Sequence, residues 1–126
     1  MMKKIDPKYL GVPNICFSLT EKEDDREKKY SKQRIERGFD DSETWCLAST
    51  ITRFILPRLK RFKDITIAYP GEIETPEDWN NIVEKMIVAF ELVLSDDASW
   101  MWSEEEKKQF EEGMDLFKKW YLGLWW

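Results

Sequence analysis

Apolar residues recur along the C-terminal half of the chain with the three-to-four-residue spacing of amphipathic helices. The clearest helix start is at Thr75, whose hydroxyl can cap a helix that has Pro76 at its first position and two acidic residues next. This pattern predicts a long helix with one broad buried face, which ends before Ser95. The apolar positions on that face are Trp79, Ile82, Val83, Met86, Ile87, Phe90, Val93 and Leu94.

The last part of the chain predicts a second amphipathic helix. Ser103 and Glu106 have the spacing of a capping box, in which each side chain hydrogen-bonds to the backbone N–H of the other residue. The segments before these two helices, residues 64–74 and 95–102, are expected to be loops. The apolar face of the last helix holds Phe110, Met114, Phe117, Trp120, Tyr121 and Leu124.

The central segment predicts a further helix, which begins at Asp40 or Asp41 and continues through Pro57. Its apolar positions stay in register on both sides of the proline. We therefore expect one helix that is kinked at Pro57 rather than two separate helices. The stripe consists of Trp45, Ala48, Thr52, Ile55, Leu59 and Phe62, and it is widened by Leu47, Ile51 and Phe54.

The first predicted helix has the weakest apolar face. It is expected to begin at Thr20, with Glu23 placed for a capping box, and to end at Gly38. Only Tyr30 and Ile35 offer apolar anchors in this charged segment. We expect a largely solvated helix whose first turns can fray.

These patterns predict an all-α fold: a small bundle of about four helices in one domain, residues 20–126, preceded by an extended arm, residues 1–19. Five Gly and five Pro in 126 residues leave little room for the many turns of a sandwich or barrel. No apolar run approaches the roughly 18 residues of a membrane span, so we expect no membrane association.

The residue types present restrict the chemistry that the chain can perform. It has no histidine, which excludes Ser-His and Cys-His nucleophile pairs and histidine general bases. Cys16 and Cys46 are too few for a disulfide framework or a zinc site, and they favour a reducing cytoplasm. We therefore expect a protein that is not an enzyme and that needs no cofactor or metal.

Charge is unevenly distributed along the chain. Residues 1–63 contain 15 Lys and Arg against 10 Asp and Glu, whereas residues 64–126 contain 5 against 15. The two halves either attract each other within the fold or present one basic and one acidic face. Because the whole chain has a net charge of −5, duplex DNA is not expected as a partner.

A cluster of basic residues in the central helix allows two interpretations. In the first, Arg58 is half-buried and pairs with Glu84 or Glu91 of the following helix, and the other basic residues are solvated. In the second, the guanidinium groups gather a phosphate or carboxylate, with an indole available for stacking. The candidate residues for this second site are Arg53, Arg58, Arg61 and Trp45.

Four of the seven tryptophans lie outside the predicted helical stripes: Trp100 and Trp102 in a loop, and Trp125 and Trp126 at the C-terminus. Exposed indoles often mark an interface, so these four predict a surface for a partner or for a second copy of the chain. The alternative is that both segments fold back and seal the ends of the bundle.

The carboxylates suggest a minor alternative, a magnesium-dependent nucleotide hydrolase of the all-helical type. Glu112 and Asp115 have the Glu-x-x-Asp spacing of such enzymes, and further acids cluster near Asp41. No matching Glu-x-x-Glu lies on a core-facing stripe, and a charged run on a helix is usually a solvated face.

Taken together, several motifs resemble a family of small acidic proteins encoded by bacteriophages and prophages, a family without an assigned activity. The resemblance covers roughly residues 37–124. It rests on Arg37-Gly38-Phe39, Asp41, Trp45, the run from Phe54 to Lys60, Tyr69-Pro70-Gly71, Trp79, Met86, Phe90 and Glu112-Gly113.

The resemblance implies a phage gene product that acts in the cytoplasm of a bacterial host. We expect it to bind and disable a host component, such as a host protein or a defence factor. The alternatives are an oligomer that sequesters a nucleotide-type signal between Arg and Trp side chains, and a virion or assembly component.

Overall fold

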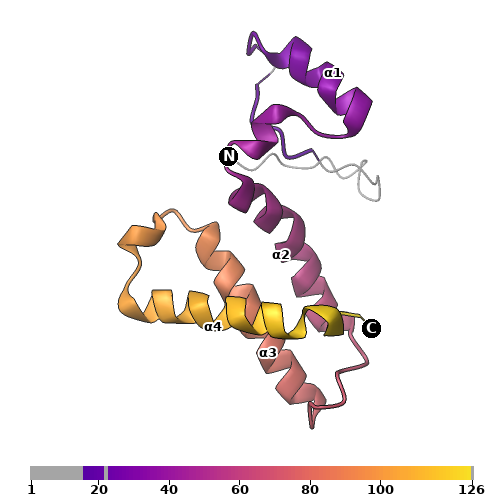
Figure 1. Cartoon of the computed structure of the whole chain (residues 1–126), viewed down its shortest axis with the longest axis vertical. Helices are drawn as coiled ribbons and strands as arrows, with labels where there is room; N and C mark the ends of the chain where they lie inside the picture. The colour runs from indigo at the N-terminus through magenta and orange to yellow at the C-terminus, as the bar shows by residue number, and fades with distance from the viewer. Residues whose placement is uncertain (1–15, 22, 126) are drawn as a thin grey trace. The chain divides into compact units, whose positions relative to one another are not determined.

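The computed structural model describes residues 16–21 and 23–125 (Figure 1). In these residues all regular structure is helical, so the predicted all-α fold is confirmed. No described helix combines the length and the hydropathy that a bilayer crossing requires. The helices are α1 (Glu27–Arg37), α2 (Leu47–Ile65), α3 (Pro76–Val93) and α4 (Glu104–Trp120), with the short 3-10 turns η2 (Asp41–Thr44), η3 (Ser99–Met101) and η4 (Tyr121–Gly123).

The chain divides into two compact units, Met1–Thr50 and Ile51–Trp126, which we call the N-terminal and the C-terminal unit. Most of the predicted arm, residues 1–15, lies outside the described residues, and so does Trp126. Residues 16–20 have no regular secondary structure. The expectation of one domain over residues 20–126 stays a prediction.

Helix α1 ends where the sequence predicts but begins later. Gly38 has a φ of 87°, the left-handed conformation that glycine adopts easily, and its N–H donates to the carbonyl of Arg34. The predicted start at Thr20 is wrong, because α1 begins at Glu27 and has no side-chain cap. The Thr20 hydroxyl instead donates to the Glu27 carboxylate at 2.6 Å, so it caps no earlier helix.

The predicted central helix is divided into two elements. Asp40 and Glu43 form a capping box, but it begins only the four-residue turn η2, and α2 starts at Leu47. The side chain of Glu43 is buried and accepts a hydrogen bond from the backbone of Phe17, which fixes this short turn in place. From Leu47 the helix runs through Pro57 without interruption, and the kink expected there stays a prediction.

Helix α3 forms the centre of the C-terminal unit. Its predicted start is confirmed: Thr75 accepts a hydrogen bond from the Asp78 N–H at 3.1 Å, and Pro76 is the first helical residue. Leu56 and Leu59 of α2 pack against its buried face. The buried residues of α3 are Trp79, Val83, Met86, Ile87, Ala89 and Phe90.

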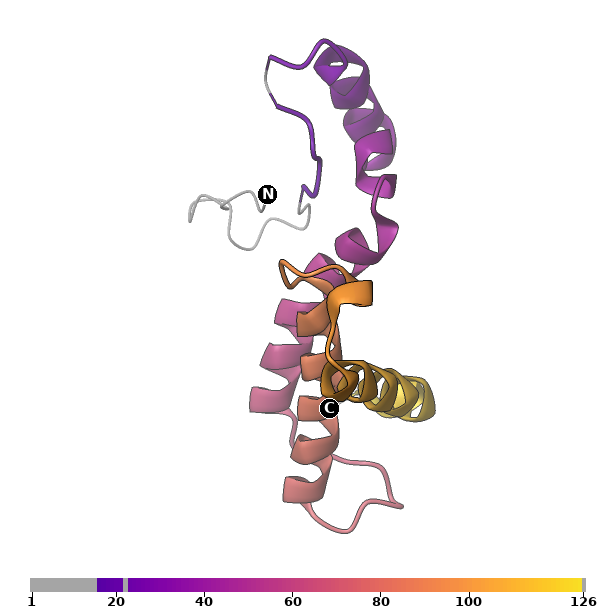
Figure 2. The ribbon, with the colours of Figure 1, turned by 90° about the vertical axis from the view of Figure 1, so that its left-hand side faces the viewer.

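Helix α4 crosses α3 at very close range (Figure 2). Its predicted capping box, Ser103 with Glu106, is confirmed. A Cβ atom added at Gly113 would lie 2.5 Å from the Cβ of Ala89 and would also clash with the Lys85 carbonyl. The absence of a side chain at Gly113 therefore allows the two helices to touch.

Aromatic rings extend the contact between the helices. The ring of Trp79 meets Phe62 at 6.5 Å and Trp120 at 6.1 Å between centroids, and both contacts are edge-to-face. Phe90 and Phe117 form a third edge-to-face pair between α3 and α4 at 5.1 Å. This geometry suits the ring quadrupoles and ties α2, α3 and α4 into one core.

Candidate functional site

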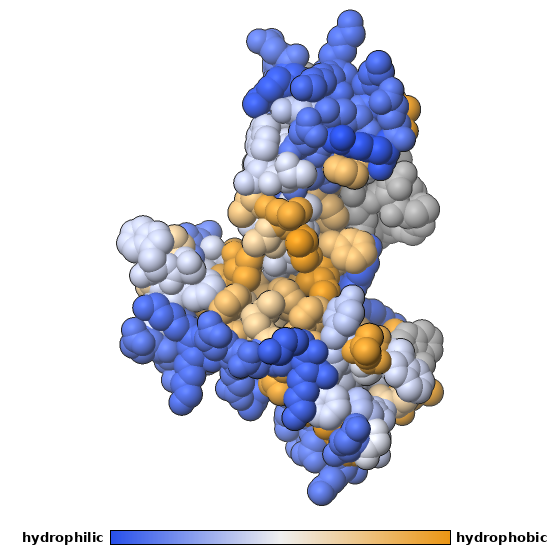
Figure 3. Space-filling view, in the orientation of Figure 1, coloured by the Kyte–Doolittle hydropathy of each residue, from blue (hydrophilic) through white to orange (hydrophobic). Residues whose placement is uncertain are grey.

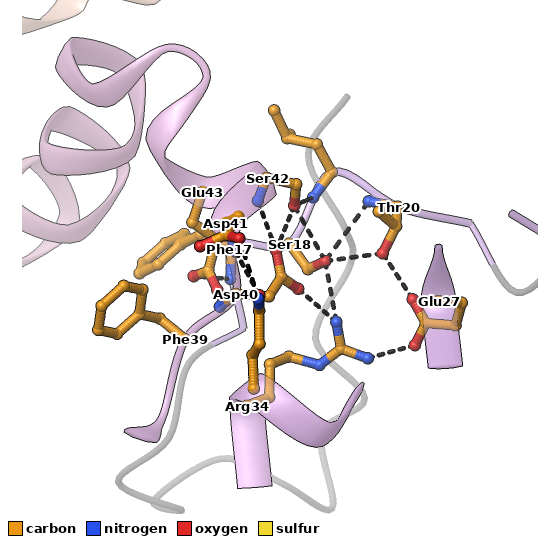
Figure 4. Close-up of polar contacts among 12 residues, drawn as sticks. Phe17, Ser18, Thr20, Glu27, Arg34, Phe39, Asp40, Asp41, Ser42 and Glu43 are labelled. Carbon is orange, nitrogen blue, oxygen red and sulfur yellow. Dashed lines mark hydrogen bonds and ion pairs between the residues drawn. The ribbon is translucent and has the colours of Figure 1, made fainter. Parts of the chain in front are cut away.

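The N-terminal unit contains a polar network around the guanidinium of Arg34 (Figure 4). This group forms ion pairs with Glu27 and with Asp40 and also donates to the Ser18 hydroxyl at 3.2 Å. Asp40 is fully buried, and it accepts a further hydrogen bond from the backbone N–H of Ser42 at 2.8 Å. The network thus joins α1, η2 and the segment before α1.

Two side chains of η2 hold the segment of residues 17–19. The Ser42 hydroxyl accepts from the Leu19 N–H at 2.9 Å, and the Glu43 carboxylate accepts from the Phe17 N–H at 3.2 Å. The other oxygen of Glu43 accepts from the Asp40 N–H at 2.7 Å. These side chains supply the backbone hydrogen bonds that a segment without regular structure lacks.

The pKa values of the network follow from these contacts. Burial opposes ionisation of Asp40, but hydrogen bonds from Ser18, Ser42 and Arg34 outweigh it and lower its pKa. A hydrogen bond from Thr20, followed by the Arg34 pair, lowers the pKa of Glu27. The carboxylates are therefore ionised at neutral pH and already bonded, which indicates a structural role.

The basic cluster of α2 is arranged differently from the first interpretation. Arg58 is exposed and pairs with neither predicted carboxylate; its guanidinium lies 4.0 Å from the Phe54 ring centroid and donates to the Phe54 carbonyl at 2.8 Å. Two lysines form ion pairs with the carboxylates of α3 instead: Lys63 with Glu84, and Lys60 with Glu91. The expected buried Arg58 pair is thus wrong, because helix α2 turns its lysines rather than Arg58 toward α3.

Two of the predicted anion-binding residues share one hollow in the C-terminal unit. Arg58 and Arg61 both line a depression of about 400 Å³. Its other walls are apolar and come from α2 and from Leu124 beyond α4. The apolar residues of α2 that line it are Ile55, Leu59, Phe62 and Ile65.

The other two predicted residues do not line this hollow. Arg53 lies half-buried on α2 but outside it. Trp45 belongs to the N-terminal unit, where its ring packs edge-to-face with the ring of Tyr30. The Arg26 guanidinium lies 4.8 Å from the centroid of the Trp45 ring. The prediction that Trp45 belongs to a core stripe is wrong, since its side chain is half exposed.

Of the four tryptophans predicted as an interface, the three that the structure describes lie at the two ends of α4. Trp100 in η3 is 80% exposed, whereas Trp102 packs on Phe110 at 5.1 Å. Trp125 follows η4 and is 66% exposed, and Trp126 lies outside the described residues. A helix of 17 residues is about 25 Å long, so Trp100 and Trp125 do not form one patch.

The C-terminal turn, residues 121–125, presents apolar side chains next to the hollow. Leu122 is 88% exposed, and Tyr121 and Trp125 are also exposed. Leu124 points the other way, into the core cluster and the hollow wall. On the face seen in Figure 3, apolar side chains also gather beside α2, while α4 presents hydrophilic ones.

The carboxylates considered for a metal site have other partners. Glu112 pairs with Lys85 at 2.6 Å, and this contact lowers the pKa of its carboxyl. Asp41 pairs with Arg37 and accepts from Gln33. Within residues 16–21 and 23–125, no three His, Cys, Asp or Glu side chains are grouped so that they could hold a metal ion.

Sequence reasoning missed the Arg34 network and the role of Leu124. An N-cap at Asp40 or Asp41 was predicted, but nothing local indicates that Arg34 reaches Asp40 across the reversal at Gly38. Leu124 was placed on an apolar face, but its contact with α2 depends on the path of the chain after α4.

Comparisons of the chain with family models, with curated proteins and with solved structures gave no significant match. The resemblance to phage-encoded proteins therefore stays a prediction that rests on the motifs alone.

Proposed function

We propose that this chain is a non-enzymatic binding protein that docks on a protein partner through its C-terminal turn. In the phage setting that the resemblance implies, the partner is a component of the bacterial host that the complex inhibits. The exposure of Leu122 and Trp125 beside a well-packed core is the observation that carries the proposal.

The C-terminal turn is anchored but not covered. An added Cβ at Gly123 would lie 2.9 Å from Pro70, and the Tyr121 ring packs edge-on against Phe117 at 5.4 Å. The backbone is therefore fixed while Leu122 and Trp125 point outward. Large apolar side chains on a rigid support lose little entropy on binding and are typical of interface hot spots.

The electrostatics favour binding over catalysis. Every described carboxyl group whose pKa departs from its ordinary value has it lowered, by hydrogen bonds or by a basic neighbour. A general acid needs a pKa raised toward neutrality, which these groups lack. The nucleotide alternative is less well supported, because none of the described tryptophans lines the hollow that holds Arg58 and Arg61.

The test combines affinity capture from bacterial cells with calorimetry on the purified partner. The full chain is expected to retain a specific host protein that binds it after separate purification. The double variant Leu122→Ser, Trp125→Ser should weaken that binding by at least about thirtyfold, the usual size of a hot-spot effect.

Trp100→Ser serves as the matched control, because it removes an exposed indole at the opposite end of α4. It should leave the affinity unchanged. Equal affinity of the double variant and the unaltered chain, or a captured protein that fails to bind when pure, would overturn the proposal.

A further inference from the structure

We propose that the hollow on α2 binds a small molecule that carries one anionic group on an apolar body, such as an aryl or a medium-chain carboxylate. This site shares Leu124 with the C-terminal turn but includes neither Leu122 nor Trp125, the residues proposed for docking, and it does not depend on the docking proposal. The lining of the hollow, the contacts of its two arginines and the ion pairs of the neighbouring lysines support this assignment.

The hollow has the size and the walls of a ligand site. Its volume of about 400 Å³ falls within the range of roughly 300–1,000 Å³ that is usual for such sites. Ile55, Leu59 and Phe62 follow one another on one helical face, and Leu124, from beyond α4, also lines the hollow. An apolar body placed there would remove hydrocarbon surface from water on both partners.

Among the described residues that line the hollow, the two arginines supply the only charges, and both are positive. The carbonyl of Phe54 and the Phe54 ring hold the guanidinium of Arg58 in place, and among the described residues only one of its five N–H groups has an acceptor. No carboxylate of the described residues lies within ion-pair distance of Arg58 or Arg61. A preorganised guanidinium beside a second one suits a carboxylate or sulfonate group.

The lysines of α2 do have carboxylate partners, so the lack of ion pairs at the two arginines of the hollow is not shared by every basic residue of the helix. Lys60 and Lys63 each have a carboxylate of α3 within 3.4 Å and 2.8 Å, respectively. The acidic residues of the C-terminal unit thus neutralise the lysines, and the arginines are left at the rim of an apolar surface. A ligand with both an anionic and an apolar part satisfies the two features together.

The same lining disfavours a nucleotide. A base and a sugar carry several donors and acceptors, and burying them against Ile55, Leu59 and Ile65 without hydrogen bonds would cost free energy. The hollow offers guanidinium groups at its edge but apolar side chains elsewhere. It therefore matches one compact charge rather than a ligand that is polar throughout.

The experiment uses the isotopically labelled full chain and three probes, with binding followed by NMR chemical shifts. 4-Phenylbutyrate carries both parts, 4-phenylbutanamide keeps the apolar body without the charge, and acetate keeps the charge alone. We expect 4-phenylbutyrate to saturate one site, with shifts centred on residues 55–65 and Leu124. The amide should bind at least about tenfold more weakly, and acetate should not saturate.

Variants then test the arginines. Arg61→Gln and Arg58→Gln should each weaken 4-phenylbutyrate binding by about tenfold without changing the melting temperature, since both side chains are exposed. Lys60→Gln is the control, because this residue lies on the same helix but outside the lining.

Four outcomes would overturn the proposal: no saturable binding of 4-phenylbutyrate, equal binding of the amide, equal binding of acetate, or unchanged binding to both arginine variants. The probe experiment involves no protein partner, so its result is separable from the test of protein docking. Loss of docking in Leu122→Ser, Trp125→Ser with retained probe binding would show that the two surfaces act independently.

Discussion

The two units of this chain are stabilised by different physical means. In the N-terminal unit, the only large apolar side chain buried among the described residues is Tyr30, and the elements are joined by the Arg34 network. The C-terminal unit buries a continuous cluster from α2 and α3, centred on Trp79. One unit therefore depends on a few directional contacts and the other on many non-directional ones.

This difference determines how the stability of each unit should respond to substitutions and to acid. A buried polar network is favourable only while every member is satisfied, because removal of one group leaves its partners desolvated and unpaired. An apolar core loses stability in proportion to the volume and surface removed. Substitutions in the apolar core should therefore cost the most stability, and partial neutralisation of the network the least.

Truncation of the central indole should have the largest effect. Trp79→Ala removes a fully buried ring together with its contacts to Phe62 and Trp120, and should cost about 3–5 kcal/mol of unfolding free energy. Chemical denaturation with and without the substitution measures it. Trp100→Ala, at an exposed indole, should stay within about 0.5 kcal/mol; a similar loss at both positions would contradict the core assignment.

Removal of the network centre should have the next largest effect and should be confined to the N-terminal unit. Arg34→Met leaves the buried Asp40 carboxylate without its ion pair, at a cost of about 2–3 kcal/mol, since Arg34 itself is partly exposed. Amide hydrogen exchange at Phe17 and Leu19 should accelerate strongly. Lys32→Met, at an exposed residue of α1, is the control and should leave both amides protected.

A methyl group at the helix crossing should have a moderate effect on the C-terminal unit. Gly113→Ala gains helix propensity but forces a Cβ against the Lys85 carbonyl and Ala89, so we expect a net loss of about 1–2 kcal/mol. Thermal and chemical unfolding measure it. Gly71→Ala, where an added Cβ meets nothing within 4 Å, should be nearly neutral; stabilisation by Gly113→Ala would mean that the helices can separate at no cost.

Acid should have the smallest effect on stability, and it should act on the N-terminal unit rather than on the C-terminal unit. The effect is small because acid neutralises the carboxylates of the network only in part. The folded-state pKa values of Asp40 and Glu27 lie below their ordinary values of 3.8 and 4.5. Their stabilisation is therefore complete above about pH 5 and is lost as the pH falls through the folded-state values. After correction for intrinsic rates, hydrogen exchange at the Leu19 amide should accelerate below pH 4.5, whereas the amides of α3 should stay protected. Simultaneous loss of amide protection in both units would contradict this prediction.

The sequence indicated those elements whose signals are local. Thr75-Pro76 and the Ser103–Glu106 box specify their helix starts through residues three or fewer positions apart, and both were confirmed. The start at Thr20 failed because the Thr20 hydroxyl bonds to the Glu27 carboxylate, a contact that depends on the fold of the intervening turns. Local patterns thus predict which side chains can cap a helix, but not which of them bind another side chain instead.

The candidate site was predictable in part for the same reason. Arg58 and Arg61 are three positions apart on one helix, so their shared hollow follows from helical geometry. The predicted apolar stripe of α2 holds from Thr52 to Phe62, whereas Ala48 is exposed and the buried Leu56 was not included. The apolar pattern could not show which side of the wide face would be covered. Phe54, which was assigned to that face, is half exposed and supports Arg58 instead.

The crossed indoles of Trp79 and Trp120 have an optical consequence. Their planes are inclined by 82° at a centroid distance of 6.1 Å, so their electronic transitions couple and rotate polarised light as a pair. A signal from two coupled tryptophans of one unit arises in the C-terminal unit alone, since the N-terminal unit contains a single tryptophan, Trp45. The intact chain therefore carries its own spectroscopic label, with which the melting of one unit can be followed while the other is perturbed.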